Sequence, residues 1–188
     1  MAKTLAQLIV AVHDITPPSD DTAAYLNEAQ YMLVMESNRV VDVDVTVVNG
    51  VFNCPVDCIK VDSVGWEGVA LSLYYRNFFP DDREGTPRYY VVRGSAVQLY
   101  PAPAGGTATL IYCPAPDDMV QTADTSALDR ADEALIAYAK HKIYIRQEDQ
   151  AAAEFWESQW IKEAAKWIAE ENKKHQRSYR LKAYGRFR

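Results

Sequence analysis

Cysteine and histidine are the residues of this chain whose chemistry is easiest to judge from spacing, because both bind metals and act in catalysis. The cysteines are Cys54, Cys58 and Cys113, and the histidines are His13, His141 and His175. The cysteines are odd in number and fit no zinc-binding spacing, and the histidines are scattered. We therefore expect reduced structural thiols, no metal site and no cofactor.

Carboxylates are abundant enough for acid–base chemistry, with 26 Asp and Glu residues in 188. Asp42 and Asp44, however, alternate with valines along one predicted strand, which places them on its polar face. Charged side chains on such a face are mostly solvated. An alternative interpretation is that Asp42 and Asp44 line an acidic lumen, whose charge would repel DNA phosphates and let a duplex slide.

The sequence lacks the motifs of nucleotide binding and of nucleophilic catalysis. Gly105 and Gly106 lie in a Pro/Ala turn between two predicted strands, which is not the context of a phosphate-binding loop. No serine has the sequence context of a nucleophile elbow. We therefore expect no catalytic residues and a protein that is not an enzyme.

The last segment of the chain combines basic and aromatic side chains. Seven of the 20 basic residues follow Glu171, the last acidic residue, which leaves 13 basic against 26 acidic residues in the body of the chain. An acidic body does not wrap nucleic acid, so only the tail has the charge to bind it. We interpret the tail as a docking segment for an acidic groove on a partner or for DNA, with a disordered, solubilising end as the alternative. The candidate docking residues are Arg177, Tyr179, Arg180, Lys182, Tyr184, Arg186, Phe187 and Arg188.

Three tryptophans upstream of this segment have helical spacing. Trp156, Trp160 and Trp167 fall on one side of a predicted helix, with charged residues largely on the other side. Leu135 and Ile143 belong to the apolar stripe of the preceding predicted helix. We interpret all five as helix-packing or subunit-interface residues rather than as a ligand site.

Four helices and a block of short strands must position these residues. The apolar periodicity predicts helices over about residues 4–12, 19–38, 126–147 and 149–174. Thr4 is the expected N-cap of the first helix, residues 19–21 cap the second, and Ser126 or Asp129 caps the third. A tight turn at residues 147–149 would make the last two helices an antiparallel hairpin.

Between the second and third helices the period of the pattern changes from 3.6 to 2, starting at Arg39. Valines alternate with polar residues over 41–47, and Asn49-Gly50 predicts a type I′ hairpin turn. Further β-branched or aromatic runs occupy residues 59–64, 68–75, 88–92, 96–100 and 108–113. About six or seven short strands so spaced predict a small antiparallel sandwich or barrel.

The predicted fold class is α+β. A helical core, residues 1–38 and 117–176, carries a β insertion, residues 39–116, and ends in an extended basic arm, residues 177–188. A chain of 188 residues with 48% hydrophobic content can bury such a core with an inserted subdomain. No apolar run reaches the length of a membrane span, and residues 1–14 are too interrupted for a signal peptide, so we expect a soluble intracellular product with no membrane partner.

The order of these elements and several motifs resemble the head-to-tail adaptor, or connector, proteins of tailed bacteriophages. The motifs are residues 85–90 (GTPRYY), 97–103 (VQLYPAP), 109–116 (TLIYCPAP) and 134–140 (ALIAYAK), followed by the Glu148-Asp149 step into the last helix. They are structural motifs rather than catalytic ones, and the resemblance covers most of the chain.

The resemblance implies a structural virion protein that forms a dodecameric ring under the portal, extends the DNA channel and provides the platform for neck and tail attachment. Its implied partners are the portal protein, other neck or tail proteins (stopper, nozzle or tail-tube terminator) and further copies of the chain. Genomic DNA would pass without sequence-specific binding, and the C-terminal segment would reach the portal. The implied location is the head–tail interface of the virion, and the host cytoplasm during assembly.

Two alternatives stay open. One is another neck subunit, such as a stopper or tail-completion protein, bound to the distal side of an existing ring. The other is a small nucleic-acid-binding protein that acts through its basic tail, with an affinity that falls steeply with salt.

Overall fold

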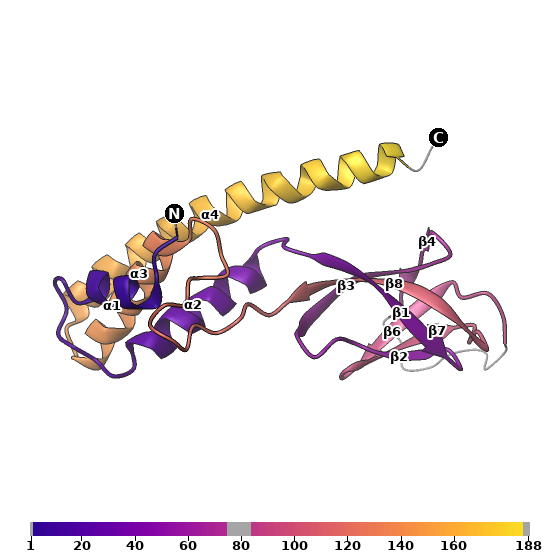
Figure 1. The fold of residues 1–188 in the computed structure, drawn as a ribbon, viewed down its shortest axis with the longest axis horizontal. Helices are drawn as coiled ribbons and strands as arrows, with labels where there is room; N and C mark the ends of the chain where they lie inside the picture. The colour runs from indigo at the N-terminus through magenta and orange to yellow at the C-terminus, as the bar shows by residue number, and fades with distance from the viewer. Residues whose placement is uncertain (1, 75–83, 186–188) are drawn as a thin grey trace. The chain divides into compact units, whose positions relative to one another are not determined.

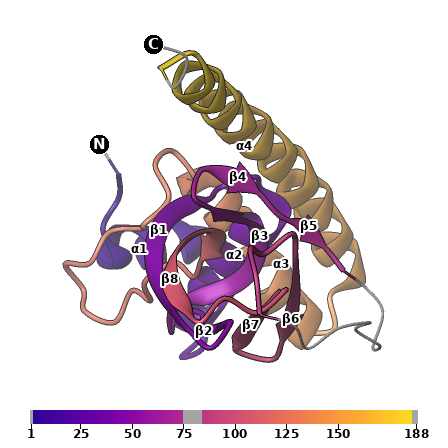
Figure 2. The ribbon, with the colours of Figure 1, turned by 90° about the vertical axis from the view of Figure 1, so that its right-hand side faces the viewer.

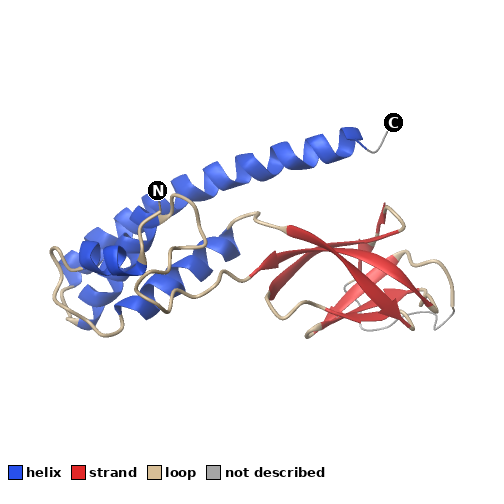
Figure 3. Ribbon diagram, viewed as in Figure 1, coloured by secondary structure: helices blue, strands red, loops and turns tan. Residues whose placement is uncertain are grey.

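The computed structural model describes residues 2–74 and 84–185, and it describes side chains as far as Lys174. The chain divides into two compact units, and the helices and strands separate between them (Figure 3). One unit, here the helical unit, comprises Met1–Arg39 and Ala115–Arg188. The other, the β unit, comprises Val40–Pro114. The predicted α+β class, with helices and an inserted small β barrel, is confirmed.

The helical unit contains α1 (Leu5–Val12), α2 (Thr22–Glu36), α3 (Asp132–Arg146) and α4 (Gln150–Gly185), labelled in Figure 1. The sequence predicts the start of α1 correctly. Thr4 and Gln7 form a capping box, in which the Gln7 amide donates to the Thr4 hydroxyl over 3.3 Å and the Thr4 amide donates to the Gln7 side chain over 3.0 Å. Leu5, Leu8 and Val12 form the buried face of this helix.

The caps predicted for α2 and α3 are not used in the way the sequence suggests. Asp21 occupies the N-cap of α2 without a side-chain capping bond, and its carboxylate pairs with Arg146 of α3 instead. Helix α3 begins at Asp132, after both predicted caps, with Ala131 at the N-cap. The Ser126 hydroxyl is taken by a bond to Gln30, and Arg130 has a positive φ of 61°, which a helix does not tolerate.

The turn predicted between the last two helices is confirmed. Gln147 is the C-cap of α3, Glu148 adopts a φ of 60°, and the Asp149 carboxylate accepts a bond from the Ala152 amide. Helices α3 and α4 then lie side by side (Figures 1 and 2). Helix α4 passes its predicted end near Lys174 and continues to Gly185, so residues 177–185 have a helical backbone where the sequence predicts an extended arm.

The β unit contains eight strands that curl into a nearly closed barrel (Figure 2). The strands are β1 (Val41–Val48), β2 (Val51–Asn53), β3 (Cys58–Trp66), β4 (Val69–Ala70), β5 (Ser72–Leu73), β6 (Tyr89–Arg93), β7 (Ala96–Tyr100) and β8 (Gly105–Pro114). Their order in the sheet is β4-β3-β8-β1-β2-β7-β6-β5. The named strands pair in antiparallel fashion, as predicted, except that β5 lies parallel to β6.

The β1–β2 connection is the predicted two-residue turn. Val48 pairs with Val51, and Asn49 and Gly50 adopt φ values of 49° and 74°. Positive φ at both central residues is the mark of a type I′ turn, whose twist matches that of the flanking strands.

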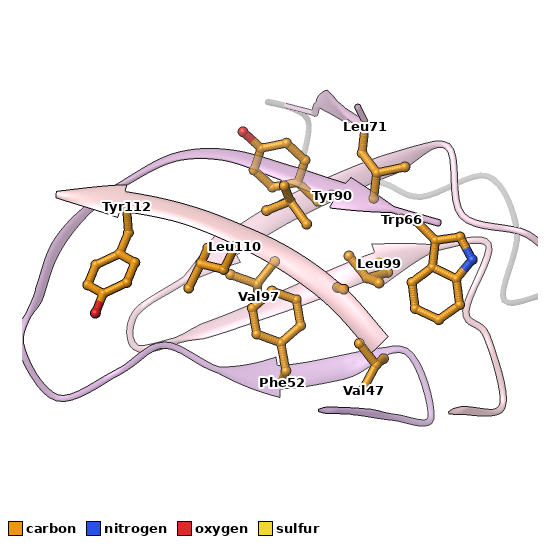
Figure 4. Close-up of a cluster of buried hydrophobic side chains, with 11 residues drawn as sticks. Val47, Phe52, Trp66, Leu71, Tyr90, Val97, Leu99, Leu110 and Tyr112 are labelled. Atoms are coloured by element: carbon orange, nitrogen blue, oxygen red, sulfur yellow. The ribbon is translucent and has the colours of Figure 1, made fainter. Parts of the chain in front are cut away.

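Alternate residues of the strands fill the barrel with one apolar core. Figure 4 shows side chains from several strands pointing toward one another, with Phe52, Val97 and Leu110 near the middle of the cluster. Val97, Leu99 and Leu110 have no exposed surface. Each such side chain stabilises the fold by about 1.5–3 kcal/mol relative to an exposed one, which lets strands of two or three residues persist.

Two amides of α2 hold the loop that returns from the β unit. Asn27 binds the Met119 backbone twice, accepting from its amide over 2.9 Å and donating to its carbonyl over 3.1 Å. The fully buried Gln30 accepts from the Ser126 hydroxyl over 2.8 Å and from the Ala127 amide over 3.0 Å. Asn27 and Gln30 therefore fix the two chain segments of the helical unit to each other.

Replacing Gln30 with Met keeps its size but leaves the Ser126 hydroxyl and the Ala127 amide without their acceptor. We expect the free energy of unfolding to fall by about 2–4 kcal/mol, because an unpaired buried polar group costs about 1–3 kcal/mol. Urea unfolding followed by far-UV circular dichroism measures this. The control Gln150→Met changes an exposed glutamine, and an equal loss in both variants would contradict the role given to Gln30.

Gly106, predicted to lie in a turn, is the second residue of β8 and lies against the ring of Trp66. A Cβ there would lie 2.6 Å from Trp66 Cη2, and its φ is 144°. Gly106→Ala should therefore cost about 1–3 kcal/mol of stability through overpacking and backbone strain. Gly105→Ala is the matched control, since its Cβ would have 3.6 Å to the nearest atom. Thermal melts in which both variants behave as wild type would contradict this packing.

Candidate assembly surfaces

Two kinds of site could give the described residues a chemical role, a cluster of metal ligands and a pocket lined by catalytic side chains. Among the side chains that the structure describes, in residues 2–74 and 84–174, no three His, Cys, Asp or Glu group closely enough to hold a metal ion. An open pocket of about 410 Å³ in the β unit is lined by Trp66, Glu67, Glu84, Gly85, Thr86, Pro87, Pro103 and Ala104. This lining includes no histidine or cysteine, so it lacks the nucleophile-and-imidazole pair of acyl transfer. None of the described helices combines the length and apolar character needed to cross a membrane.

The three cysteines come together in the fold, although their spacing does not suggest it. Cys54 follows β2, Cys58 begins β3, and Cys113 lies near the end of β8, the strand that pairs with β3. All three are free thiols. Burial first, and then the neighbouring Cys54 thiol, raise the pKa of Cys58 to about 11. Protonated thiols are poor nucleophiles, which is consistent with a packing role against the barrel core.

The tryptophans of α4 all lie on the side of the helix that packs inside the helical unit. Trp167 is 5% exposed, and its indole N–H donates to the Asp129 carbonyl over 2.9 Å. The half-buried Trp160 meets the Tyr138 ring edge-on at 4.9 Å. Leu135 and Ile143 of α3 are buried in the same unit. Leu135, Ile143 and Trp167 are thus buried within the helical unit, whereas a part for the half-buried Trp156 and Trp160 in a subunit interface stays a prediction.

Trp156 covers a buried lysine. The Lys140 ammonium lies 4.5 Å from the centre of the Trp156 ring and 2.8 Å from the Asp14 carboxylate. The Lys140 side chain is 5% exposed. A buried lysine needs both kinds of partner, a counter-ion and a ring face, to offset its lost hydration. The bond to Lys140 lowers the pKa of Asp14.

A second polar cluster joins α2 to α3. Glu28 accepts a 2.6 Å bond from the Tyr138 hydroxyl and a 3.0 Å bond from the Lys142 ammonium. Burial alone would raise the pKa of Glu28, but these two bonds outweigh it and lower that pKa. Burial and the bond to Glu28 raise the pKa of Tyr138. The cluster keeps the carboxylate charged and holds α2 in register with α3.

The predicted acidic residues of β1 lie on an exposed strand. Asp42 and Asp44 are both exposed, and Asp44 accepts a 2.9 Å bond from the Thr109 hydroxyl of β8. The core-forming residue of this strand is Val47, on the other face. Asp42 and Asp44 thus point away from the interior of the barrel, and a lumen lined by them would have to be formed outside the barrel.

The structure describes only the backbone of the predicted docking arm, and only as far as Gly185. Arg177, Tyr179, Arg180, Lys182 and Tyr184 belong to the helical backbone of α4. Arg186, Phe187 and Arg188 lie outside the described residues. The described part of the arm, residues 177–185, thus continues the helix that carries the tryptophans.

Sequence reasoning missed Asn27, Gln30 and Lys140. A signal existed for Gln30, because it lies four residues after Leu26 and three before Leu33, inside the apolar stripe of α2. A polar residue in such a stripe is costly unless it has partners, so it indicates a buried hydrogen-bond network. Lys140 carries the same signal inside the buried stripe of α3.

Comparison with known proteins identifies a family for the chain. A protein-family model described as SU10 adaptor protein matches residues 3–182. The match spans the β unit and both segments of the helical unit. No curated protein matches the chain.

The raised pKa of Cys58 predicts how its alkylation depends on pH. Only the thiolate reacts, so labelling of folded Cys58 by iodoacetamide should rise about tenfold per pH unit without a plateau up to about pH 10. The unfolded chain should level off above its ordinary pKa of about 8.5. Because the pKa of Cys58 is higher in the folded chain than in the unfolded chain, the protonated thiol stabilises the folded state. This contribution to stability is complete below about pH 8.5 and is lost as the pH approaches 11. Peptide mass spectrometry measures the rates, and a folded-state plateau near pH 9 would contradict the assignment.

Proposed function

The chain belongs to the SU10 adaptor protein family, a family of phage head–tail adaptors, and from this membership we propose that it forms a ring under the portal of the virion. The family is one of structural proteins rather than enzymes. The observation that carries the proposal is the family match over residues 3–182, which includes both units. In this ring the protein would extend the DNA channel and give neck and tail components a platform.

The length of α4 supports a docking role for its C-terminal part. Its 36 residues span about 54 Å, whereas the 15 residues of α3 span about 22 Å. The Asn38 amide donates to the Asn172 side chain over 2.9 Å, and the Lys174 ammonium lies 4.0 Å from the Asp129 carboxylate. Residues 175–185 continue the helix beyond these two contacts. We propose that this projecting segment and residues 186–188 dock onto the portal.

The positive charge of the arm is favourable at the C-terminal end of a helix and would attract an acidic partner. The positions after Glu171 are basic, aromatic or neutral, and basic side chains near a helix C-terminus interact favourably with its dipole. Their positive potential would also speed encounter with an acidic groove of the portal. The proposed docking residues are Arg177, Tyr179, Arg180, Lys182, Tyr184, Arg186, Phe187 and Arg188.

The acidic body fits a channel through which DNA passes without binding. The net charge of the chain is −6 although the arm is basic, so the rest repels phosphate. We propose that genomic DNA passes the ring without sequence-specific contact, with Asp42 and Asp44 as candidates for a channel-facing acidic surface. The proposed partners are the portal, further neck or tail proteins, and other copies of the chain, met first in the host cytoplasm and then in the virion.

Deleting residues 177–188 should abolish binding to portal-bearing capsids while leaving the fold intact, because the buried packing residues Ala153, Ala164 and Trp167 of α4 all precede the deletion. Co-sedimentation with capsids and electron microscopy of the portal vertex measure binding, and circular dichroism checks the fold. A second variant replaces Arg177, Arg180, Lys182, Arg186 and Arg188 with Gln, which removes the charge but keeps the length.

A truncated chain that still forms a ring at the portal vertex would contradict the docking role of the arm. Binding of the full chain to the distal side of a ring already present would indicate another neck subunit. Binding to free DNA alone, with an affinity that falls steeply with salt, would favour a nucleic-acid-binding protein.

A further inference from the structure

Two of the three cysteines stand at the two ends of one loop of the β unit. Cys54 follows β2, Cys58 begins β3, and three residues separate them. The Cys58 amide donates to the Pro55 carbonyl over 3.0 Å, which closes a β-turn inside the loop. The Cys54 amide donates to the Ser95 carbonyl over 2.8 Å, which fixes the other end of the loop to the β6–β7 turn. The backbone therefore holds both cysteines at the base of a narrow loop.

The two thiols meet at this base. The Cys58 thiol is hydrogen-bonded to the Cys54 sulfur, and both side chains pack against the buried cluster of the barrel. Both cysteines are partly exposed, and Val56 at the tip of the loop is fully exposed, so a small reagent can approach the sulfurs. Cys113, by contrast, is 5% exposed. Cys54 and Cys58 thus combine mutual contact with access from solvent.

Thiols in contact are the starting geometry of a disulfide. Each sulfur lies only two bonds from its Cα atom, so a pair in contact needs only small side-chain and loop adjustments to bond. The bond would join the end of β2 to the start of β3. These two strands do not pair, because β8 and β1 lie between them in the sheet. A disulfide here would therefore add a link that the strand ladders of the barrel do not provide.

The surroundings of the pair affect both the stability and the speed of such a bond. Burial raises the pKa of both thiols, and the bond from Cys58 opposes this effect at Cys54. The reduced pair therefore gains no stabilisation from a thiolate, which favours a disulfide that resists reduction once formed. Formation is slow at neutral pH, because only the thiolate attacks. Cys54 is the attacking sulfur, since Cys58 donates a bond to it.

We propose that Cys54 and Cys58 are an oxidation site, which a low-molecular-weight disulfide such as oxidised glutathione converts into a disulfide bond between β2 and β3. Cys54 loses its proton to water, and its sulfur attacks one sulfur of the reagent and displaces one thiolate. Cys58 then loses its proton, and its sulfur attacks the Cys54 sulfur and displaces the second thiolate. The two displaced thiolates take up the two protons. Two cysteine thiols are thus oxidised, and the reagent is reduced to two thiols.

The timing of this oxidation rests on the proposed function. A virion protein is made in a cytoplasm whose thiol pool keeps cysteines reduced, whereas a released particle stands in a medium without that pool. The slow reaction would leave both thiols intact during assembly. The disulfide would then stabilise the barrel in the released particle.

Oxidation of the purified full chain tests the site. The chain is treated with oxidised glutathione at about pH 8.5, quenched in acid, alkylated and digested with trypsin. Both cysteines then fall in one peptide, residues 40–60, and Cys113 falls in another, residues 94–130. We expect peptide 40–60 to lose two hydrogens and to take up no alkylating reagent, at a rate that rises about tenfold per pH unit.

The oxidised chain should also melt about 4–8 °C higher than the reduced chain, because the bond restricts a short loop of the unfolded chain. Thiols that persist in peptide 40–60 would overturn the proposal. A link between peptides 40–60 and 94–130 would overturn it as well, since it would make Cys113 a partner. An oxidised chain that melts no higher than the reduced chain would overturn the stabilising role.

Single substitutions test the order of attack. Cys58→Ser keeps a hydroxyl that can donate to Cys54, so glutathione should attach to Cys54 and remain there. Cys54→Ser should take up glutathione more slowly at Cys58, and equal rates in the two variants would overturn the assigned order. Cys113→Ala is the matched control, which keeps the pair and should oxidise as the wild type does. Circular dichroism checks the fold of each variant, and the wild-type peptide map decides the proposal if a variant does not fold.

Released particles collected without reductant test the timing. We expect peptide 40–60 from such particles to be in the oxidised form, and from freshly made chains in cells to be in the reduced form. Particles that contain the chain with both thiols reduced would overturn the proposed timing. Particles that lack the chain would count against the proposed function only, because the purified chain tests the oxidation site by itself.

Discussion

The helical unit depends on one constraint: it is built from two chain segments with an entire β unit between them, and those segments must be joined by side chains. The amides of Asn27 and Gln30 make this joint, because each binds backbone or hydroxyl groups of the returning loop. Amides suit this task, since one side chain both donates and accepts. Backbone bonds from Leu5 to Asp124 and from Ala6 to Thr122 add to the joint where α1 begins.

Polar side chains of α3 join the same two segments. Lys140 reaches Asp14, and Lys142 with Tyr138 reaches Glu28, so α3 is held to the first segment at two points besides its apolar contacts. Removing Asp14 would leave the buried Lys140 charge without its counter-ion, which costs more than the net stabilisation that the pair provides. The β unit needs no comparable joint, because its core of apolar side chains comes from one continuous stretch of chain.

The sequence predicts the parts of the fold that rest on local chemistry. Asn49-Gly50 and the alternating valines give the β1–β2 hairpin, and Thr4 with Gln7 gives the start of α1. Predictions fail where a local signal is diverted by a distant partner, as when Ser126 binds Gln30 and Asp21 binds Arg146 instead of capping. The length of α4 is predictable in part, because Arg, Leu, Lys and Ala favour helix. The helical spacing of the tryptophans correctly predicts one packed side of α4, with Trp167 buried inside the helical unit.

The pairing of β1 with β8 has a consequence for the history of the chain. Val41 stands opposite Tyr112 in this antiparallel pair, so the two ends of the β unit lie close together, with the Cα atoms of Val41 and Tyr112 about 5 Å apart. A module whose ends nearly touch can be lost, replaced or exchanged by recombination while a turn of a few residues closes the host scaffold. The barrel can therefore be exchanged as a module without rebuilding the helical unit.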